Sequence, residues 1–291
     1  MTTTIKAEHI LAVQCRLGEG PRWHPDEHRL YWVDIEQNGI YRLDPATGQY
    51  ERFDLGLPVG AVAFREKGGL VLATRDGFAY WDEGTAQLDF IADPEPDRPD
   101  ARFNDGSVDS RGRFWAGTMT HKGAENALYR LDPDGQVHTM ERGLTISNGL
   151  GWSPDGRTMY LTDTNRSIIH AYDYHEPSGT VTRRHTFVEV PVKDGYPDGL
   201  AVDASGYVWS AHYGGSRVTR YDPDGNIERV VEVPVPNVTA CAFGGPDLST
   251  LYITTAWSGM TDAQRAERPQ SGDLFAVETG ITGTPEHKFA G

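Results

Sequence analysis

The stretch NGLGWSPDGRTMYLTD, from Asn148 to Asp163, combines a polar residue pair, a tight turn and a short apolar segment. Ser-Pro-Asp-Gly is a strong turn signal, and the aliphatic and aromatic residues after it favour a β-strand. The same turn-and-strand pattern occurs in six copies along the chain. The first apolar residues of the six strands, separated by 40 to 49 residues, are Leu30, Leu70, Phe114, Met159, Val208 and Leu251.

A second strand-like segment follows each copy. These segments begin at Ile40, Phe78, Leu128, Ile169, Val218 and Leu274. A period of about 45 residues with several short strands in each repeat is typical of propeller blades, which must stack on one another to bury their faces. We therefore predict an all-β, six-bladed β-propeller in which residues 1–291 form one domain. We expect the N-terminal strand around His9–Cys15 to close the ring by completing the last blade near Leu274–Glu278.

Composition excludes several classes of function. The formal charge is −15, from 42 acidic and 27 basic residues, and no run of Lys or Arg is present, which argues against nucleic-acid binding. No apolar window approaches the roughly 18 residues of a membrane span. The N-terminus lacks a signal-peptide pattern, so we expect a cytoplasmic protein, either a monomer or a weak homo-oligomer. Cys15 and Cys241 are expected to be buried free thiols, with a disulfide between them as the alternative.

Aligning the segments upstream of each turn places one residue of every copy in an equivalent position, which we call the axial position. The predicted axial residues are Glu19, Val59, Asp105, Asn148, Asp198 and Thr239. In a propeller the innermost strands line the central channel, so these residues should converge on the axis. The alternative is that Asn148-Gly149 and Asp198-Gly199 are ordinary hairpin turns, in which such dipeptides are common.

Carboxylates gathered at the axis would repel one another unless a cation neutralised them. Carboxylate and amide oxygens favour Ca²⁺, Mg²⁺ or Mn²⁺, and are also compatible with Zn²⁺ and Fe²⁺. Clusters of Cys or His with zinc spacing are absent, and His121 and His212, near the expected mouth, are predicted to be packing or surface residues. No G-x-S-x-G sequence supports a serine hydrolase triad. The sequence therefore predicts one divalent metal site at the axis.

Several motifs resemble a known family. They are LGEGPRW, RFNDGSVDSRGRFWAGTM, ISNGLGWSPDGRTMYLTD, YPDGLAVDASGYVWSAHYGGSRVTRYDPDG and CAFGGPDLSTLYITTA. In this order they are similar to the SMP-30/gluconolactonase/luciferin-regenerating-enzyme family, which includes regucalcin and bacterial sugar lactonases. The resemblance extends from about Leu17 to Gly272 and implies a six-bladed propeller with one divalent metal ion, in agreement with the repeat count.

The resemblance also assigns residues. It implies metal ligands at Glu19 in LGEGP, Asn148 in SNGL and Asp198 in PDGL, and substrate contacts at Arg102 and Asn104 in RFNDG. Asp105, the next residue of that motif, is expected beside the site and not as a ligand. The alternative for Arg102 is a salt bridge with Asp105 or another acid at the mouth.

One stretch departs from the family pattern. Members such as regucalcin follow GTM with acidic residues that help to orient the sugar, whereas this chain continues as GTMTHKGAEN. Lys122 and Glu125 are therefore the candidate sugar contacts in the segment His121–Asn126. The preferred sugar stays open at this point.

The resemblance implies metal-dependent hydrolysis of a sugar (aldono-) lactone, such as glucono-, xylono- or arabinono-lactone, to the sugar acid. Asp198 would be the catalytic residue, because it can accept a proton from water and return it to the leaving ring oxygen. Two alternatives use the same metal: a regulatory propeller of the regucalcin type, and a phosphotriester or aryl-ester hydrolase. A protein-interaction propeller is disfavoured by the polar axial residues.

Overall fold

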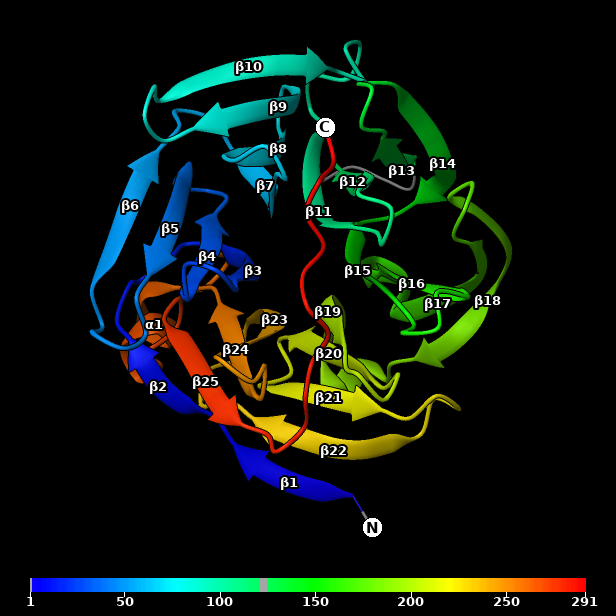
Figure 1. The fold of residues 1–291 in the computed structure, drawn as a ribbon. Helices are drawn as coiled ribbons and strands as arrows, with labels where there is room; N and C mark the ends of the chain where they lie inside the picture. Colours follow the sequence, from blue (N-terminus) through cyan, green and yellow to red (C-terminus); the bar gives the residue numbers. More distant parts are fainter. Residues whose placement is uncertain (1, 121–124) are drawn as a thin grey trace.

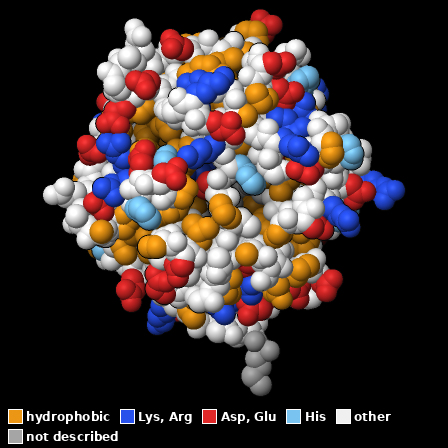
Figure 2. Space-filling model, in the orientation of Figure 1, with side chains coloured by type: hydrophobic (Ala, Val, Ile, Leu, Met, Phe, Trp, Pro, Cys, Tyr) orange, Lys and Arg blue, Asp and Glu red, His pale blue; other side chains and the backbone are white. Residues whose placement is uncertain are grey.

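The structure is a computed structural model that describes residues 2–120 and 125–291. Its strands form six sheets arranged around a central axis (Figure 1). The predicted six-bladed β-propeller is therefore confirmed, and each of the six repeated turn-and-strand segments supplies the second strand of a blade. Acidic and basic side chains are interspersed over the face shown in Figure 2. Within the described part of the chain, no helix is long and apolar enough to cross a membrane.

Each blade has four antiparallel strands, and in five of the six blades these strands follow one another in the sequence from the axis outward. The innermost strands are β3 (Gly18–His24), β7 (Val59–Phe64), β11 (Arg102–Val108), β15 (Ser147–Trp152), β19 (Tyr196–Val202) and β23 (Val238–Gly244). The second strands are β4 (Arg29–Asp34), β8 (Leu70–Thr74), β12 (Phe114–Met119), β16 (Thr158–Asp163), β20 (Val208–Tyr213) and β24 (Thr250–Thr255).

The outer half of each blade is more exposed. The third strands are β5 (Gly39–Leu43), β9 (Gly77–Asp82), β13 (Asn126–Leu131), β17 (Ile168–His175), β21 (Arg217–Tyr221) and β25 (Leu274–Glu278). The outermost strands are β6 (Tyr50–Asp54), β10 (Gln87–Ala92), β14 (Val137–Leu144), β18 (Thr180–Glu189), β22 (Ile227–Glu232) and β2 (Glu8–Leu11). The remaining elements are β1 (Thr3–Lys6), the 3₁₀ turns η1 (Thr164–Arg166) and η2 (Val192–Asp194), and α1 (Asp262–Glu267).

Two of the Asp-x-x-Gly turns that precede a second strand are bonded to the core by their aspartates. The carboxylate of Asp109 accepts the indole N–H of Trp115 at 2.8 Å, and Asp203 accepts that of Trp209 at 2.9 Å. Both indoles are fully buried, so each bond satisfies a polar group that would otherwise be stranded between blades. This explains why the same turn is followed by an aromatic residue at a fixed spacing.

Both ends of the N-terminal segment join the ring. β2 pairs antiparallel with β25, through Glu8 opposite Ala276 and His9 opposite Phe275. The strand ends at Leu11, earlier than the expected span, because Asp273 accepts the backbone N–H groups of Val13 and Gln14 at 3.0 Å and turns the chain inward. β1 pairs in parallel with β22, a fifth strand that the repeat did not predict.

The C-terminal segment, residues 281–291, crosses one face of the ring (Figure 1). Its backbone bonds to loops of several blades, including Gly283 N to Leu248 O at 2.8 Å and Ala290 N to Gly112 O at 3.0 Å. Phe289 is fully buried in the cluster shared by the second and third blades. The segment therefore ties non-adjacent blades together across the axis.

Replacing Phe289 with Ala should lower the free energy of unfolding by about 3–5 kcal/mol, because it leaves a cavity in this cluster. The measurement is urea denaturation followed by tryptophan fluorescence. Phe90→Ala is the matched control, since the Phe90 side chain is 53% exposed and its loss should cost no more than about 0.5 kcal/mol. Equal losses of unfolding free energy in the two variants would show that the C-terminal segment does not help to hold the blades together.

Candidate metal centre

All six innermost strands are irregular at the same place. Pairing between the first and second strands of every blade shifts at the residues Glu19/Arg22, Val59/Ala61, Phe103/Asp105, Ser147/Leu150, Pro197/Leu200 and Val238/Ala240. A bulge at this point re-aims the side chain that it carries. Six bulges at one level of the channel therefore define the axial positions structurally.

The register corrects two of the predicted axial residues. In the second blade the bulged residue is Gly60 and not Val59, and in the third it is Asn104 and not Asp105. A Cβ on Gly60 would lie 2.4 Å from the carbonyl oxygen of Phe103, so only glycine fits there. The equivalent residue of each blade lies four positions before the residue that pairs with the first apolar residue of the second strand, which gives the axial set Glu19, Gly60, Asn104, Asn148, Asp198 and Thr239.

The hairpin-turn alternative for the Asn-Gly and Asp-Gly pairs is wrong. Asn148 lies within β15 and Asp198 within β19. The glycines after them serve close packing between innermost strands, since a Cβ on Gly149 would lie 2.5 Å from Asp198 O and one on Gly199 would lie 2.5 Å from the Cβ of Ala240. Glycine thus lets the strands approach the axis closely.

The three predicted metal ligands converge in the channel. Glu19, Asn148 and Asp198 are each at most 5% exposed. Asn148 Nδ2 donates to Asp198 Oδ1 and, at 3.1 Å, to Thr164 Oγ1. Asn148 Oδ1 is buried and has no hydrogen-bond partner among the described residues. An amide oxygen without a partner beside a buried carboxylate is a position that a cation would satisfy.

The electrostatics of the cluster support the same interpretation. Burial, followed by the nearby charges of Asp198 and Asp105, raises the pKa of the Glu19 carboxyl well above its usual range. Burial and the charge of Asp105 likewise raise the pKa of Asp198 well above its usual range. A divalent cation would remove the mutual repulsion and favour both carboxylates, so the residues present fit such an ion.

The candidate ligand set contains few charged groups. Within residues 2–120 and 125–291, no group of three or more His, Cys, Asp or Glu side chains is placed to hold a metal ion. The candidate ligands are instead two carboxylates and one amide oxygen. Such a set is selective for hard or borderline cations and leaves coordination positions for water or substrate.

Arg102 and Asn104 lie next to this cluster as a bonded pair. Arg102 Nη1 donates to Asn104 Oδ1 at 2.8 Å and to Phe103 O at 2.9 Å, while Asn104 Nδ2 donates to Ser147 O at 3.1 Å. Burial lowers the pKa of Arg102 to about 10, against the opposing charges of Glu19, Glu36 and Asp198. Its guanidinium therefore faces the same carboxylates as the candidate metal.

Asp105 pairs with Arg22 and not with Arg102, which the sequence analysis considered. Arg22 Nη2 lies 3.9 Å from Asp105 Oδ1, and Arg22 also bonds to Gly106 O. Burial raises the pKa of Asp105, and the charge of Arg22 opposes that rise. Arg22 stands three residues after Glu19 in LGEGPRW, but nothing in the motif itself shows that its side chain turns into the channel.

Sequence reasoning also missed three residues around the cluster: Thr164, Glu36 and Tyr213. Thr164 fixes the Asn148 amide through the bond described above. Burial and the charges of Asp198, Glu36 and Glu19 raise the pKa of Tyr213 to about 12, so its phenol keeps its proton and donates to Ser258 O at 2.8 Å. Glu36 in turn accepts from Ser258 Oγ at 2.8 Å.

Two predicted sugar contacts lie in the segment after β12. Lys122 and the neighbouring His121 fall outside the described residues. Glu125 is exposed, and its carbonyl oxygen accepts from Arg98 Nη1 at 2.9 Å. Met119, the last residue of β12, pairs with Arg102.

Other predicted residues are structural. His212 is buried with Nδ1 at 2.9 Å from Asp194 O, and burial lowers its pKa to about 4, as expected for a packing residue. Cys15 and Cys241 are both buried and free, which confirms the prediction of two thiols.

Comparisons with known proteins agree with this architecture. Residues 17–257 match the family model described as SMP-30/Gluconolactonase/LRE-like region. The chain is 40% identical over 289 residues to pentonolactonase XacC of Haloferax volcanii, covering 96% of each chain. It is 36% identical over 298 residues to regucalcin of Xenopus laevis, covering 99% of this chain and 100% of the relative. The solved structure of a calcium-binding protein, regucalcin, from Agrobacterium tumefaciens superimposes with a TM-score of 0.95 at 29% identity over 99% of both chains.

The raised pKa values of Glu19 and Asp198 predict that the stability of the metal-free protein falls as the pH rises. Unfolded Asp and Glu titrate near pH 4, so above that pH the folded chain retains protons that the unfolded chain has lost. Stability should therefore fall as the pH rises toward the folded pKa values. In chelator-treated protein the urea midpoint should drop from pH 5 to pH 8, and Glu19→Gln should reduce that drop.

The matched control is Glu66→Gln, which removes an exposed carboxyl on the β7–β8 turn and should leave the drop unchanged. If the urea midpoint of Glu19→Gln fell between pH 5 and pH 8 as much as that of the parent protein, the axial carboxylates would not be repelling one another.

Proposed function

The chain belongs to the SMP-30/gluconolactonase/LRE-like family, and we propose that it hydrolyses a sugar (aldono-) lactone with one divalent metal ion held by Glu19, Asn148 and Asp198. The observation that carries the proposal is the unpartnered, buried Oδ1 of Asn148 beside the carboxyl of Asp198. The charge of Asp198 acts on Arg102, which is bonded to Asn104, so the proposed cation site would lie close to a pair of side chains that can hold a substrate.

Lactone hydrolysis needs three contributions at this mouth. Water attacks the carbonyl carbon, the bond from that carbon to the ring oxygen breaks, and the ring oxygen gains a proton. A bound divalent ion would supply electrostatic stabilisation of the negative charge that develops on the carbonyl oxygen. The chain itself must move the proton and orient the ring.

We assign the proton transfer to Asp198. Its Oδ1 is held by the Asn148 amide, which fixes the direction of the carboxyl group, and its burial excludes competing water. As a carboxylate it would accept the proton of the attacking water and then return it to the leaving ring oxygen. Burial and the charge of Asp105 raise the pKa of Asp198, and a divalent cation bound beside it would favour the ionised carboxylate.

Arg102 and Asn104 would hold the sugar. The mutual hydrogen bond between them restricts both side chains, so little conformational freedom is lost when they bind hydroxyl or carbonyl oxygens of the substrate. A polyhydroxylated ring matches this donor set better than an aryl ester or phosphotriester, which would need a more apolar mouth. We retain Lys122 and Glu125 as proposed contacts on the third blade.

The names of the relatives support a narrower proposal for the substrate and the metal ion. Identity of 40% to a protein named pentonolactonase favours a five-carbon lactone, of the xylono- or arabinono- type, over glucono-lactone. Ca²⁺, Mg²⁺, Mn²⁺, Zn²⁺ and Fe²⁺ are the candidate ions, and the calcium-binding structural relative favours Ca²⁺. The two free thiols favour the cytoplasm as the location.

Asp198→Asn and Asn148→Ala should each reduce kcat/KM for aldonolactones by about 100-fold or more. Proton release in a pH-stat, with each of the candidate ions added in turn, measures the rate. Asp224→Asn, on an exposed turn between β21 and β22, is the control and should retain full activity. Near-normal turnover by folded Asp198→Asn on every lactone tested would refute the assignment.

A second candidate function is a metal-binding regulator without physiological turnover. It is favoured by the 36% identity to a protein named regucalcin and by the fit of the same residues to a cation. Only the lactonase needs Arg102 to contact a substrate.

Calorimetric titration with Ca²⁺ beside the pH-stat assay separates the two functions. For the lactonase we expect metal binding together with lactone-dependent acid release, and Arg102→Ala should raise KM while leaving metal affinity within about threefold. Tight metal binding without acid release from any pentono- or hexonolactone would favour the regulator. Including phenyl acetate and a phosphotriester in the panel tests the remaining hydrolase alternative.

A further inference from the structure

The bond between Asn148 and Thr164 joins the innermost strand of the fourth blade to the turn that follows its second strand. Asn148 lies in β15, and Thr164 is the first residue of η1, directly after β16. Asn148 Nδ2 donates to Thr164 Oγ1 at 3.1 Å and also to Asp198 Oδ1. An amide nitrogen has two N–H donors, so both are used. Only the amide oxygen Oδ1 is left without a partner in the part of the chain that the structure describes.

The two acceptors decide which atom of the amide points away from them. A rotation of the amide by half a turn would place Oδ1 against Asp198 Oδ1, and an ionised carboxylate has no proton to donate. Thr164 holds the second N–H, so the amide cannot turn about its last side-chain bond without losing a hydrogen bond. A ligand that is already held in one orientation loses little conformational freedom when it binds a cation.

The position of Thr164 is itself fixed by bonds on both sides. Its backbone N–H donates to Ile146 O at 3.2 Å, and its carbonyl oxygen accepts the N–H of Ser167 at 2.9 Å. The side chain is β-branched and buried, which restricts its rotation. Because Ile146 stands two residues before Asn148, the hydroxyl of Thr164 is placed relative to the same chain segment that carries the amide.

Asp163 adds a second connection between the same two segments. Its fully buried carboxylate accepts the backbone N–H of Thr145 at 2.9 Å and the Thr145 hydroxyl, and on its other oxygen Arg166 Nη1 at 2.6 Å. Asp163 also pairs with Ser147 between β16 and β15. The turn that carries Thr164 is therefore bonded to the start of the strand that carries the candidate ligand.

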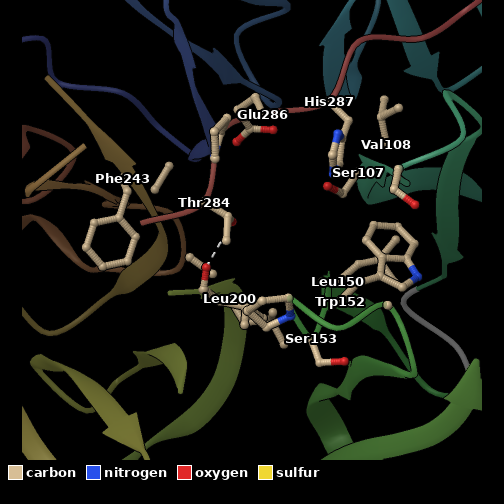
Figure 3. A pocket seen from close by; sticks show the side chains of 18 of the residues that line it. Ser107, Val108, Leu150, Trp152, Ser153, Leu200, Phe243, Thr284, Glu286 and His287 are labelled. Carbon is tan, nitrogen blue, oxygen red and sulfur yellow. Dashed lines mark hydrogen bonds between the residues drawn. The ribbon is translucent and has the colours of Figure 1, made fainter. Parts of the chain in front are cut away.

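The next side chains along the innermost strands supply no such bond. Beyond the cluster the channel contains a chamber of about 390 Å³ (Figure 3). Leu150, two residues after Asn148, belongs to its lining, and so does Leu200 on β19. Both side chains are apolar and cannot donate to or accept from the amide. The hydroxyl that orients Asn148 comes instead from the turn after the second strand.

We propose that Thr164 is a positioning residue for the cation, because it holds the Asn148 amide so that Oδ1 is presented to the ion. Thr164 acts through Asn148 and is not assigned as a ligand. The proposal rests on the proposed function in one respect, the assignment of Asn148 to the metal, and it does not depend on which lactone is hydrolysed. Residues that orient a metal ligand typically contribute about 10–100-fold to metal affinity.

Thr164→Val removes the hydroxyl and keeps the β-branched shape. Calorimetric titration of the chelator-treated, full-length protein with Ca²⁺, Mg²⁺, Mn²⁺ and Zn²⁺ identifies the ion that the parent binds most tightly, and the variants are titrated with that ion. We expect Thr164→Val to bind it at least about tenfold more weakly. Thr164→Ser restores the hydroxyl and should bind within about threefold of the parent.

The matched control is Thr162→Val, the same change two residues earlier. Thr162 Oγ1 is fully buried on β16 and has no hydrogen-bond partner among the described residues, so its removal should leave the affinity for the ion as in the parent. Circular dichroism checks the fold of each variant. Thr164→Ala, which also lacks the hydroxyl, takes the place of Thr164→Val if the valine variant does not fold.

Asn148→Asp separates orientation of the amide from a general effect on packing. A carboxylate has two equivalent oxygens, so it presents an oxygen to the ion whichever way it turns. Adding Thr164→Val to Asn148→Asp should therefore change the affinity by less than about threefold, whereas a merely structural effect would be the same in both backgrounds.

Three outcomes would overturn this proposal and leave the proposed function standing. They are parent-like affinity of folded Thr164→Val, an equal loss in Thr162→Val, and an equal loss in Thr164→Ser. If the parent bound none of the four ions, the cation site of the proposed function would fail, and the role of Thr164 with it.

Discussion

Carboxylates that converge in a buried channel repel one another, and the inner part of this protein is organised around that constraint. Glu19, Asp105 and Asp198 come from three blades and are each nearly inaccessible to solvent. Burial, and then the charges of neighbouring acids, raise the pKa values of Glu19 and Asp198, so the ionised carboxylates are unfavourable unless positive charge is present. Two buried arginines supply part of it, Arg22 beside Asp105 and Arg102 beside the other two. The proposed cation would supply the rest where the Asn148 oxygen lacks a partner.

Such a cluster can exist only because the scaffold around it is rigid. A bulge in every innermost strand turns one side chain toward the axis, and glycines after the bulges allow the strands to approach closely. The ring is then closed twice, by β2 on β25 and by the C-terminal segment across the opposite face. The C-terminal segment joins two non-adjacent blades through Gly283 on Leu248 O and Ala290 on Gly112 O, which opposes their separation.

Sequence reasoning recovered the features that repeat and missed those that do not. Six turn-and-strand copies predicted the fold, because each blade must satisfy the same packing problem. Glu19, Asn148 and Asp198 were predicted to share the axial position because a polar residue before glycine recurs in register. Val59 and Asp105 were misplaced by one residue, since a bulge leaves no mark in the spacing of a strand. Neither β1 nor the burial of Phe289 recurs in the other copies of the repeat, so the repeat could not predict them.

Arg22 shows why the role of a single, non-repeated side chain cannot be predicted from a sequence pattern. In the sequence it is one arginine in a strand, where alternation cannot tell an inward from an outward side chain. In the structure it contacts Asp105 of the axial cluster and Glu286 of the C-terminal segment. The guanidinium of Arg22 is thus shared between an acid on β11 and an acid on the C-terminal segment. Because the charge of Arg22 acts on both acids, the interaction of Arg22 with Glu286 and its interaction with Asp105 are electrostatically linked.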